Sequence, residues 1–158
     1  MATDAFAGAF KAYDIRGRVP DQLNGSVVAR IGAALSSQLR SGPVVVGRDV
    51  RLSSHDLQEA LTRGLLSVGR DVIDIGLCGT EEVYFQTDHL DAAGGVMVTA
   101  SHNPRGDNGI KVYDDRGIQI VAPWDSAIAA RLDQAPPADR IPLRPGKVDR
   151  VPDSVIEA

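Results

Sequence analysis

The sequence predicts one α/β domain, a three-layer α/β/α sandwich around a mostly parallel or mixed sheet of about four strands. Short β-branched runs alternate along the chain with segments whose apolar residues recur at helical spacing. Residues 44–46 are consecutive valines, and a run without alternation is typical of a strand covered on both faces. A strand, a helix and a second strand follow one another between residues 44 and 76, as in a βαβ unit. A length of 158 residues suits one domain of ordinary size.

The first part of the chain contains a weak strand pattern, a helix and a buried strand. Residues 10–13 alternate weakly, as in a strand. Apolar residues on one helix face predict a helix over residues 24–40, with Asn24 as its N-cap and residues 42–43 as its stop. Residues 44–46 follow directly, and we expect them to form a central strand of the sheet.

A second helix and a second strand complete the βαβ unit. Either Ser53 or Ser54 could cap the start of this helix, since a serine hydroxyl can accept from a free backbone N–H. Gly69 suits the left-handed position just past the end of a helix. Residues 72–76 then read as a strand. The helix of such a unit packs on one face of its two parallel strands, and the crossover is right-handed in about 98% of cases.

The next elements are a short helix and strands on either side of a polar segment. Residues 80–90 should be helical, because acidic residues in the first turn complement the helix dipole. Residues 94–99 read as a buried strand and residues 110–113 as a half-buried one. A turn at residues 114–117 leads into a further strand-like run, residues 118–120.

A last helix over residues 123–134 is expected, with Ile128 and Leu132 facing the sheet. Prolines then break regular structure, and a final proline and cap begin another helix. The predicted organisation is therefore a flexible segment over residues 1–9, an α/β domain over residues 10–134, and a linker with the start of a truncated helix over residues 135–158.

Composition excludes several classes of function. Lys and Arg number 17 against 21 Asp and Glu, so the net charge of −4 gives no cationic excess for nucleic acid. A mean hydropathy of −0.10 disfavours a membrane protein. The single cysteine, Cys78, allows no internal disulfide, and three scattered histidines do not assemble a zinc cluster. The first residues lack the basic flank and apolar run of a secretory signal, so we expect a cytoplasmic protein.

The most informative segment is TASHNP, residues 99–104, which is followed by NGIK, residues 108–111. Ser101 comes just after a buried strand, and open α/β sheets bind ligands at the carboxyl ends of their strands. A serine hydroxyl is a weak nucleophile that needs activation. His102 is the obvious base, but in an extended backbone neighbouring side chains point to opposite faces. The elbow of α/β-hydrolases is also absent, so a serine hydrolase is the weaker alternative.

A phosphorylated Ser101 solves the activation problem differently, because its oxygen then becomes a leaving group. The phosphoryl group passes to a substrate hydroxyl, and such transfer needs cations and positioning more than covalent chemistry from the protein. Lys111 and Arg16 could supply the positive charge, while His102 and Asn103 could donate hydrogen bonds to phosphoryl or substrate oxygens.

Four motifs in order resemble one known family. They are FKAYDIRG at residues 10–17, VGRDVR at residues 46–51, GTEEVYF at residues 79–85 and TASHNP at residues 99–104. Together they are similar to the first domain of the α-D-phosphohexomutases, with the phosphomannomutase branch fitting best through GTEEVYF. The resemblance covers nearly the whole chain from Phe10 onward.

The resemblance implies specific roles. In this family Ser101 would be the phosphoserine, with its phosphoryl group also reaching a Mg²⁺ ion. Lys111 would be a general acid or base, and Arg16 would lie near the transferring phosphoryl group. The side chains that would line the site are those of His102, Asn103 and Tyr13.

The implied reaction interconverts mannose 6-phosphate and mannose 1-phosphate through a hexose 1,6-bisphosphate, which also acts as activator. A glucose-directed mutase is the nearest rival. The family's aspartate-rich metal loop, sugar-binding loop and second phosphate-binding loop are absent from this sequence, so we expect the domain to be inactive alone. A binding or assembly module that keeps the fold without turnover is the alternative from another class.

Two further features favour structural roles. Arg48, Asp49 and Arg51 alternate in charge after a strand end, which predicts an ion-pair cluster and not a substrate contact. Cys78 has no basic neighbour in sequence to lower its pKa, so we expect it to be packing material.

Overall fold

The computed structural model describes residue 9 and residues 14–120, 124–132, 134–135, 138–140 and 147–150. Its strands are β1 (Ile15–Arg18), β2 (Val44–Arg48), β3 (Val72–Leu77), β4 (Gly94–Val98), β5 (Asp107–Tyr113) and β6 (Val148–Arg150). Its helices are α2 (Gly25–Ser36), α3 (Ser54–Ser67), α4 (Thr80–His89) and α5 (Trp124–Leu132), with a 3-10 turn, η1 (Ala138–Arg140).

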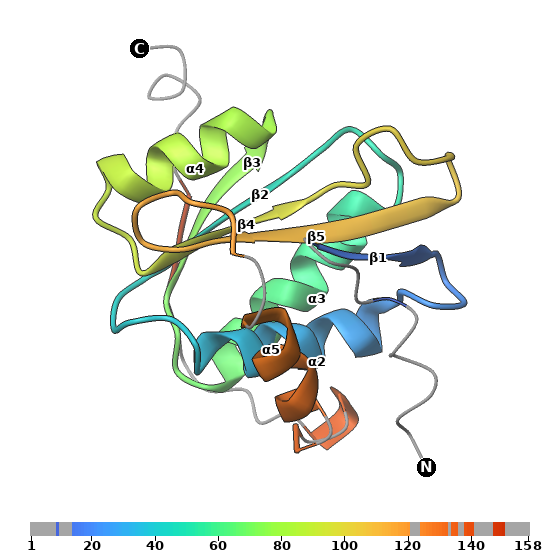
Figure 1. Cartoon of the computed structure of the whole chain (residues 1–158), viewed down its shortest axis with the longest axis horizontal. Helices are drawn as coiled ribbons and strands as arrows, with labels where there is room; N and C mark the ends of the chain where they lie inside the picture. Colours follow the sequence, from blue (N-terminus) through green and yellow to red (C-terminus); the bar gives the residue numbers. More distant parts are fainter. Residues whose placement is uncertain are drawn as a thin grey trace.

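The strands form one mixed sheet in the order β1-β5-β4-β2-β3-β6. Strand β2 is parallel to β3 and β4, and β6 is parallel to β3, whereas β5 is antiparallel to β4 and β1. Helices α2, α3 and α5 lie on one side of the sheet and α4 on the other (Figure 1). The predicted α/β/α sandwich with a mixed sheet is confirmed.

The sheet has six strands, more than the four expected. The additional ones are short edge strands, β1 and β6, which lack the alternation that identifies a strand in sequence. Strand β6 lies within residues 135–158, where we expected a linker, and pairs with Val72–Asp74. The strand expected at residues 10–13 lies outside the described residues. In residues 118–120 the structure has only an isolated bridge between Tyr113 and Gln119, because the run is too short to extend the ladder.

The starts of two helices differ in how they are capped. Asn24 caps α2 as predicted, since its Oδ1 accepts from the backbone N–H of Val27 at 3.1 Å. Neither serine caps α3 through its side chain: Ser53, at the N-cap position, already has helical angles, with φ −78° and ψ −14°. Its Oγ instead accepts a hydrogen bond from Asn108 Nδ2 at 2.8 Å. The Ser53 hydroxyl therefore connects the start of α3 to the start of β5 and does not cap the helix.

The core is divided by the sheet into two clusters. Val44 and Val46 of β2 point into the larger cluster, under α2, α3 and α5, whereas Val45 points into the smaller cluster under α4. The uninterrupted valine run therefore has a direct explanation, because both of its faces are covered. Ile128 and Leu132 are buried in the larger cluster, and in the described part α5 packs mainly on α2. We expected these two side chains to face the sheet, and they are buried in the cluster that sheet and helix residues form together.

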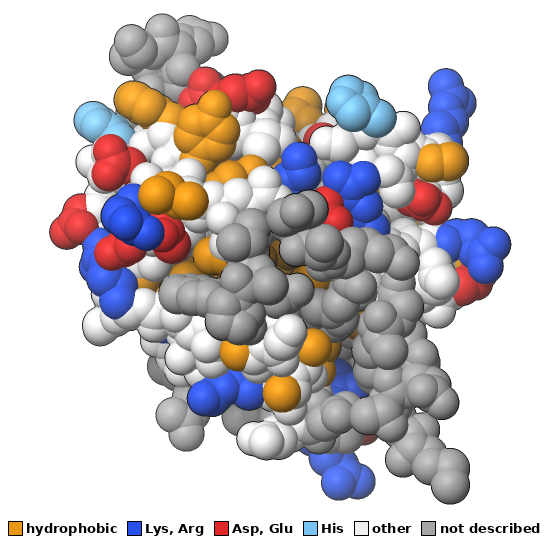
Figure 2. All heavy atoms as spheres, viewed as in Figure 1, with side chains coloured by type: hydrophobic (Ala, Val, Ile, Leu, Met, Phe, Trp, Pro, Cys, Tyr) orange, Lys and Arg blue, Asp and Glu red, His pale blue; other side chains and the backbone are white. Residues whose placement is uncertain are grey.

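Large apolar side chains are exposed on α4 and the segments beside it, as Figure 2 shows in the view of Figure 1. They are Leu77, Tyr84, Phe85 and Ile118. Tyr84 and Phe85 belong to the GTEEVYF motif, which therefore presents its aromatic side chains outward. No helix among the described residues has the length and apolar character needed to cross a bilayer.

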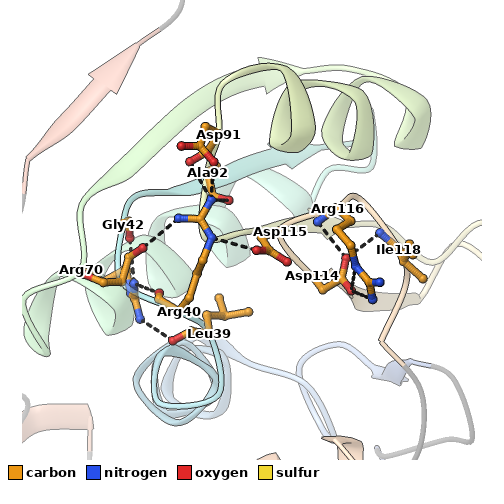
Figure 3. Close-up of polar contacts among 11 residues, drawn as sticks. Leu39, Arg40, Gly42, Arg70, Asp91, Ala92, Asp114, Asp115, Arg116 and Ile118 are labelled. Atoms are coloured by element: carbon orange, nitrogen blue, oxygen red, sulfur yellow. Dashed lines mark hydrogen bonds and ion pairs between the residues drawn. The ribbon is translucent and has the colours of Figure 1, made fainter.

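Two arginines tie together the loops at the amino ends of the parallel strands (Figure 3). Arg70, just before β3, donates to the carbonyl oxygens of Ser36 at 2.6 Å, Arg40 at 2.7 Å and Gly42 at 2.7 Å. Helix α2 has no basic residue in its last turn, so Arg70 supplies the positive charge that its carboxyl end favours. Burial lowers the pKa of Arg70, but a guanidinium stays charged at neutral pH. Arg40 in turn forms an ion pair with Asp91 at 2.6 Å.

Replacing Arg70 with alanine is expected to lower the free energy of unfolding by about 2 kcal/mol, because half-buried carbonyl groups lose their donors. Arg70→Lys keeps a cation at the end of α2 and should recover part of this loss. Urea unfolding followed by circular dichroism measures both variants. Arg63→Ala removes an exposed arginine from α3 and is the matched control, expected to unfold at the wild-type midpoint. An Arg70→Ala midpoint equal to that of the control would show that the bonds contribute nothing.

Candidate active site

The serine loop, residues 99–106, connects β4 to β5 at the carboxyl end of the parallel strands. The segment after β2 runs beside it, since the N–H of Asp49 donates to the carbonyl of Val98 at 3.0 Å. The first residue of the loop is already paired with β5, because the N–H of Thr99 donates to the carbonyl of Gly109 at 2.9 Å. The serine therefore lies where loops of an open α/β sheet diverge and leave room for a ligand.

Ser101 is exposed and has a left-handed backbone, with φ +53°, a region that non-glycine residues seldom adopt. Its N–H donates to Thr99 Oγ1 at 3.0 Å. The backbone is not extended at this point, so the alternation of side chains in an extended backbone no longer argues that His102 points away from the Ser101 hydroxyl. His102 is exposed on the same loop, but no hydrogen bond joins it to Ser101 among the contacts of the described residues. The serine–histidine pair required by a hydrolase is not formed.

The Ser101 hydroxyl contacts a lysine. Lys111 Nζ, from the middle of β5, donates to Ser101 Oγ at 3.2 Å. Strand β5 places this lysine opposite Met97 of β4, so the antiparallel pairing brings the two motifs TASHNP and NGIK together. A cation in this position can stabilise negative charge on the serine oxygen and can give it a proton.

Arg16 reaches the same loop from β1. Its Nη1 donates to Asn103 Oδ1 at 2.6 Å, and its Nε pairs with Asp14 Oδ2 at 2.6 Å. The Asn103 amide also donates to Asp107 Oδ2 at 3.1 Å, which fixes the orientation of the amide. Arg16 and Asn103 are therefore joined directly although they are far apart in sequence. Tyr13, the remaining predicted site residue, lies outside the described residues.

Asp49 and Arg51 form the ion pair predicted for them, with Arg51 Nε 3.6 Å from Asp49 Oδ2. Arg48 does not join them, because its guanidinium donates to Gln58 Oε1 at 3.0 Å. Sequence reasoning left the pair outside the site, but Arg51 also donates to the carbonyl of Ser101 at 3.1 Å. The available signal was that the segment after β2 and the serine loop follow two parallel strands, which places them side by side.

Asn108 was also missed. Its side chain is fully buried and donates to Ser53 Oγ at 2.8 Å and Ser54 Oγ at 2.9 Å. Ser54 Oγ in turn donates to Asp49 Oδ1 at 2.5 Å. These bonds connect the start of β5 to the start of α3 and leave the buried amide with partners, as burial of a polar group requires.

The Mg²⁺ ion implied by the family resemblance can be tested against the side chains near Ser101. The carboxylates beside the serine loop already accept from other side chains: Asp14 from Arg16, Asp49 from Thr99, and Asp107 from Asn103. Among the described residues, no group of three or more His, Cys, Asp or Glu side chains with metal-ligand spacing lies beside Ser101, so a phosphoryl oxygen on Ser101 would need further ligands to complete a Mg²⁺ site. Asp114 and Asp115 form ion pairs with Arg116 and Arg40. The cluster of His55, Asp56 and Glu59 is exposed on α3, as solvated polar residues commonly are.

Cys78 is held beside β2, where its N–H donates to the carbonyl of Arg48 at 3.0 Å. Burial raises the pKa of its thiol to about 11, so about one thiol in a thousand is ionised at pH 8. We expect iodoacetamide to modify native Cys78 slowly at pH 8 and about tenfold faster for each added pH unit up to pH 11. Mass spectrometry of the intact protein measures the rate. If the native protein were modified at pH 8 as fast as the protein in concentrated urea, burial would not be raising the pKa of the Cys78 thiol.

Residues 7–138 match the sequence model of phosphoglucomutase/phosphomannomutase, alpha/beta/alpha domain I. The chain belongs to this family. Over 112 residues it is 73% identical to a protein of Xanthomonas campestris pv. campestris named "Phosphohexose mutases", a match that covers 71% of this chain and 25% of the relative. Over 145 residues it is 47% identical to a phosphomannomutase of Klebsiella pneumoniae, covering 90% of this chain and 91% of that protein.

A crystal structure of a phosphoglucomutase/phosphomannomutase family protein from Burkholderia thailandensis has the same fold, with a TM-score of 0.79 and 32% identity. The similarity covers 94% of this chain and 34% of the Burkholderia protein. This chain spans about a quarter of the length of the Xanthomonas relative. The family assignment therefore concerns one domain of such proteins.

Proposed function

We propose that this chain is the catalytic-serine domain of a phosphohexomutase that interconverts mannose 6-phosphate and mannose 1-phosphate. The observation that carries the proposal is the exposed Ser101 hydroxyl, which lies on a left-handed turn at the carboxyl end of the sheet and contacts Lys111 Nζ at 3.2 Å. A serine that attacks as a nucleophile needs a neighbouring base. A phosphorylated serine needs cations, and Lys111 and Arg16 supply them on either side of this loop.

In the proposed reaction, phosphorylated Ser101 donates its phosphoryl group to the free hydroxyl of a hexose monophosphate. The bond between phosphorus and the serine oxygen breaks as a bond to the sugar oxygen forms. The sugar hydroxyl gives its proton to water, and the serine oxygen gains one from Lys111. When a phosphoryl group returns to Ser101, Lys111 takes that proton back from the serine hydroxyl and the sugar oxygen takes one from water. The hexose 1,6-bisphosphate then returns its other phosphoryl group to Ser101 by the reverse step, and an isomeric monophosphate leaves.

In this scheme Arg16 contributes a fixed positive charge beside the phosphoryl group. Its pairing with Asp14 and Asn103 fixes the guanidinium beside the serine loop, where it can balance the negative charge of the phosphoryl oxygens. His102 is exposed on the same loop and can donate a hydrogen bond to substrate oxygens. No step is assigned to Mg²⁺, because its further ligands are not found among the described residues.

Substrate choice and the need for further domains are also part of the proposal. Mannose is favoured because the Klebsiella relative is named a phosphomannomutase, and the family description, which includes phosphoglucomutase, leaves glucose phosphates as the alternative. We expect the chain to show no mutase turnover when it is alone. Formation of hexose 6-phosphate from hexose 1-phosphate by the isolated chain would refute that expectation.

The test joins this chain to the part of the Xanthomonas relative that follows the matched region; we call this protein the fused enzyme. After incubation with mannose 1,6-bisphosphate or glucose 1,6-bisphosphate, peptide mass spectrometry should find one phosphoryl group, on Ser101. The intact Xanthomonas relative treated in parallel is the positive control. An unmodified Ser101 in a folded fused enzyme, under conditions that phosphorylate the control, would overturn the proposal and favour a binding module. Labelling of Ser101 by a fluorophosphonate would instead favour a hydrolase.

A further inference from the structure

Few hydrogen bonds form within the serine loop itself. Within it, the N–H of Asn103 donates to the carbonyl of Ala100 at 3.0 Å, and the N–H of Asp107 donates to the carbonyl of Pro104 at 3.0 Å. Its residues from Ser101 to Gly106 are mostly exposed. A left-handed conformation at a serine costs about 1 to 2 kcal/mol. Contacts from outside the loop must hold this conformation if it is to persist.

Arg51 provides such contacts. Its Nη1 donates to the carbonyls of Pro104 at 2.7 Å and Asp107 at 2.9 Å. Its Nη2 donates to the carbonyls of Asn103 at 2.7 Å and Ser101 at 3.1 Å. The four N–H groups of the two Nη atoms thus each have a carbonyl acceptor, and all of these acceptors belong to the serine loop or the first residue of β5.

Asp49 orients Arg51 and also anchors the other side of the serine. Its Oδ2 is 3.6 Å from Arg51 Nε and accepts from Thr99 Oγ1 at 2.8 Å. Thr99 Oγ1 accepts from the N–H of Ser101. The two backbone polar groups of Ser101 are therefore both bound, the N–H through Thr99 and the carbonyl by Arg51. Fixing both groups restricts φ and ψ of this residue together.

We propose that Arg51, oriented by Asp49, is a positioning residue that holds the Ser101 peptide in its left-handed conformation and so keeps Oγ within reach of Lys111. The consequence of this positioning for phosphoryl transfer rests on the proposed function, whereas the effect of Arg51 on the loop conformation does not. Arg51 is not a catalytic residue, because its donors are occupied by backbone carbonyls and by Asp49. A lysine cannot replace it fully, since an ammonium group lacks the planar fork that reaches several carbonyls at once.

Hydrogen exchange of the chain, read by mass spectrometry, tests the effect on the loop. In Arg51→Ala, the peptide that covers residues 99–107 should exchange about tenfold faster or more, because its amide bonds open without Arg51. Peptides from β2 and β4 should keep wild-type exchange, and Arg63→Ala should leave the loop unchanged. Arg51→Lys should give an intermediate rate, and it serves as the test variant if Arg51→Ala does not fold. Wild-type exchange of the loop in a folded Arg51 variant would overturn the proposal.

The fused enzyme tests the effect on chemistry. Arg51→Ala should slow phosphorylation of Ser101 by hexose 1,6-bisphosphate about 100-fold, because a misplaced reacting group loses alignment. The bisphosphate concentration for half-maximal rate should stay near the wild-type value, and added methylguanidinium should restore part of the rate. A direct role in substrate binding would instead raise that concentration, which counts against positioning. If the wild-type fused enzyme is not phosphorylated, the proposed function fails, and the exchange experiment alone decides the role of Arg51.

Discussion

Replacing Ser101 with alanine is expected to lower the turnover of the fused enzyme by about 10⁴-fold or more, as for other nucleophile deletions. The alanine has no oxygen to carry the phosphoryl group between the two ends of the hexose, so the bisphosphate cannot form from the monophosphate. Stability should hardly change, because Ser101 is exposed and its hydroxyl accepts one bond, from the half-buried Lys111. A coupled assay for hexose 6-phosphate, together with thermal unfolding, separates the two effects.

Ser26→Ala is the matched control, since Ser26 is exposed in the first turn of α2 and is far from the serine loop in sequence. It should keep both turnover and stability. Turnover of Ser101→Ala within about tenfold of wild type would contradict a phosphoserine mechanism, because no bypass through the remaining residues is that efficient. Loss of cooperative unfolding in the same variant would show that the serine has a structural role.

Gly64→Ala is expected to lower the free energy of unfolding by about 3 kcal/mol or more. Helices α2 and α3 pass closest to each other here, and a Cβ on Gly64 would overlap the backbone carbonyl of Ala29. On the facing helix, a Cβ on Gly32 would lie 2.5 Å from the carbonyl oxygen of Leu61. Backbone atoms cannot rotate away as a side chain can, so the helices themselves would have to separate and part of the larger core would open.

Gly25→Ala tests whether this loss comes from the crossing or from replacing any helical glycine. A Cβ at Gly25 meets Ala60 Cβ at 3.6 Å, an ordinary contact, so alanine should be neutral or should add about 0.5 kcal/mol of stability. Urea unfolding of both variants measures the difference. Equal stability of Gly64→Ala and the wild type would mean that the two helices have more space between them than the structure shows.

The sequence was sufficient to predict the layers and most of the central elements. Helix α2 and the valine run of β2 have strong periodic signals, because each presents apolar residues to a defined part of the core. Edge strands have no such signal. β1 and β6 depend on pairing with β5 and β3, which lie far away in sequence, so they could not be read locally.

The serine caps show a second limit. Ser53 and Ser54 have the right residue type to start α3, but the buried amide of Asn108 takes up both hydroxyls. A local pattern predicts which bonds a side chain can make, and the tertiary fold decides which of them it makes.

The candidate site divides in the same way. Ser101 and Lys111 come from motifs that flank one turn, so the sequence predicted their proximity. The contact between Arg16 and Asn103 follows from the antiparallel pairing of β1 with β5. The strand order could place Arg51 beside the serine loop, but no residue pattern shows which bonds it makes, because its acceptors are backbone carbonyls, which every residue carries.

The most direct test of the central claim follows radioactive phosphate through Ser101 during one turnover. The fused enzyme is mixed rapidly with mannose 1,6-bisphosphate labelled in both phosphoryl groups, quenched at successive times and digested. Label should appear on the Ser101 peptide at least as fast as the steady-state turnover, and it should pass to added unlabelled mannose 6-phosphate. Label that appears on Ser101 more slowly than turnover, or on another residue, would contradict the account.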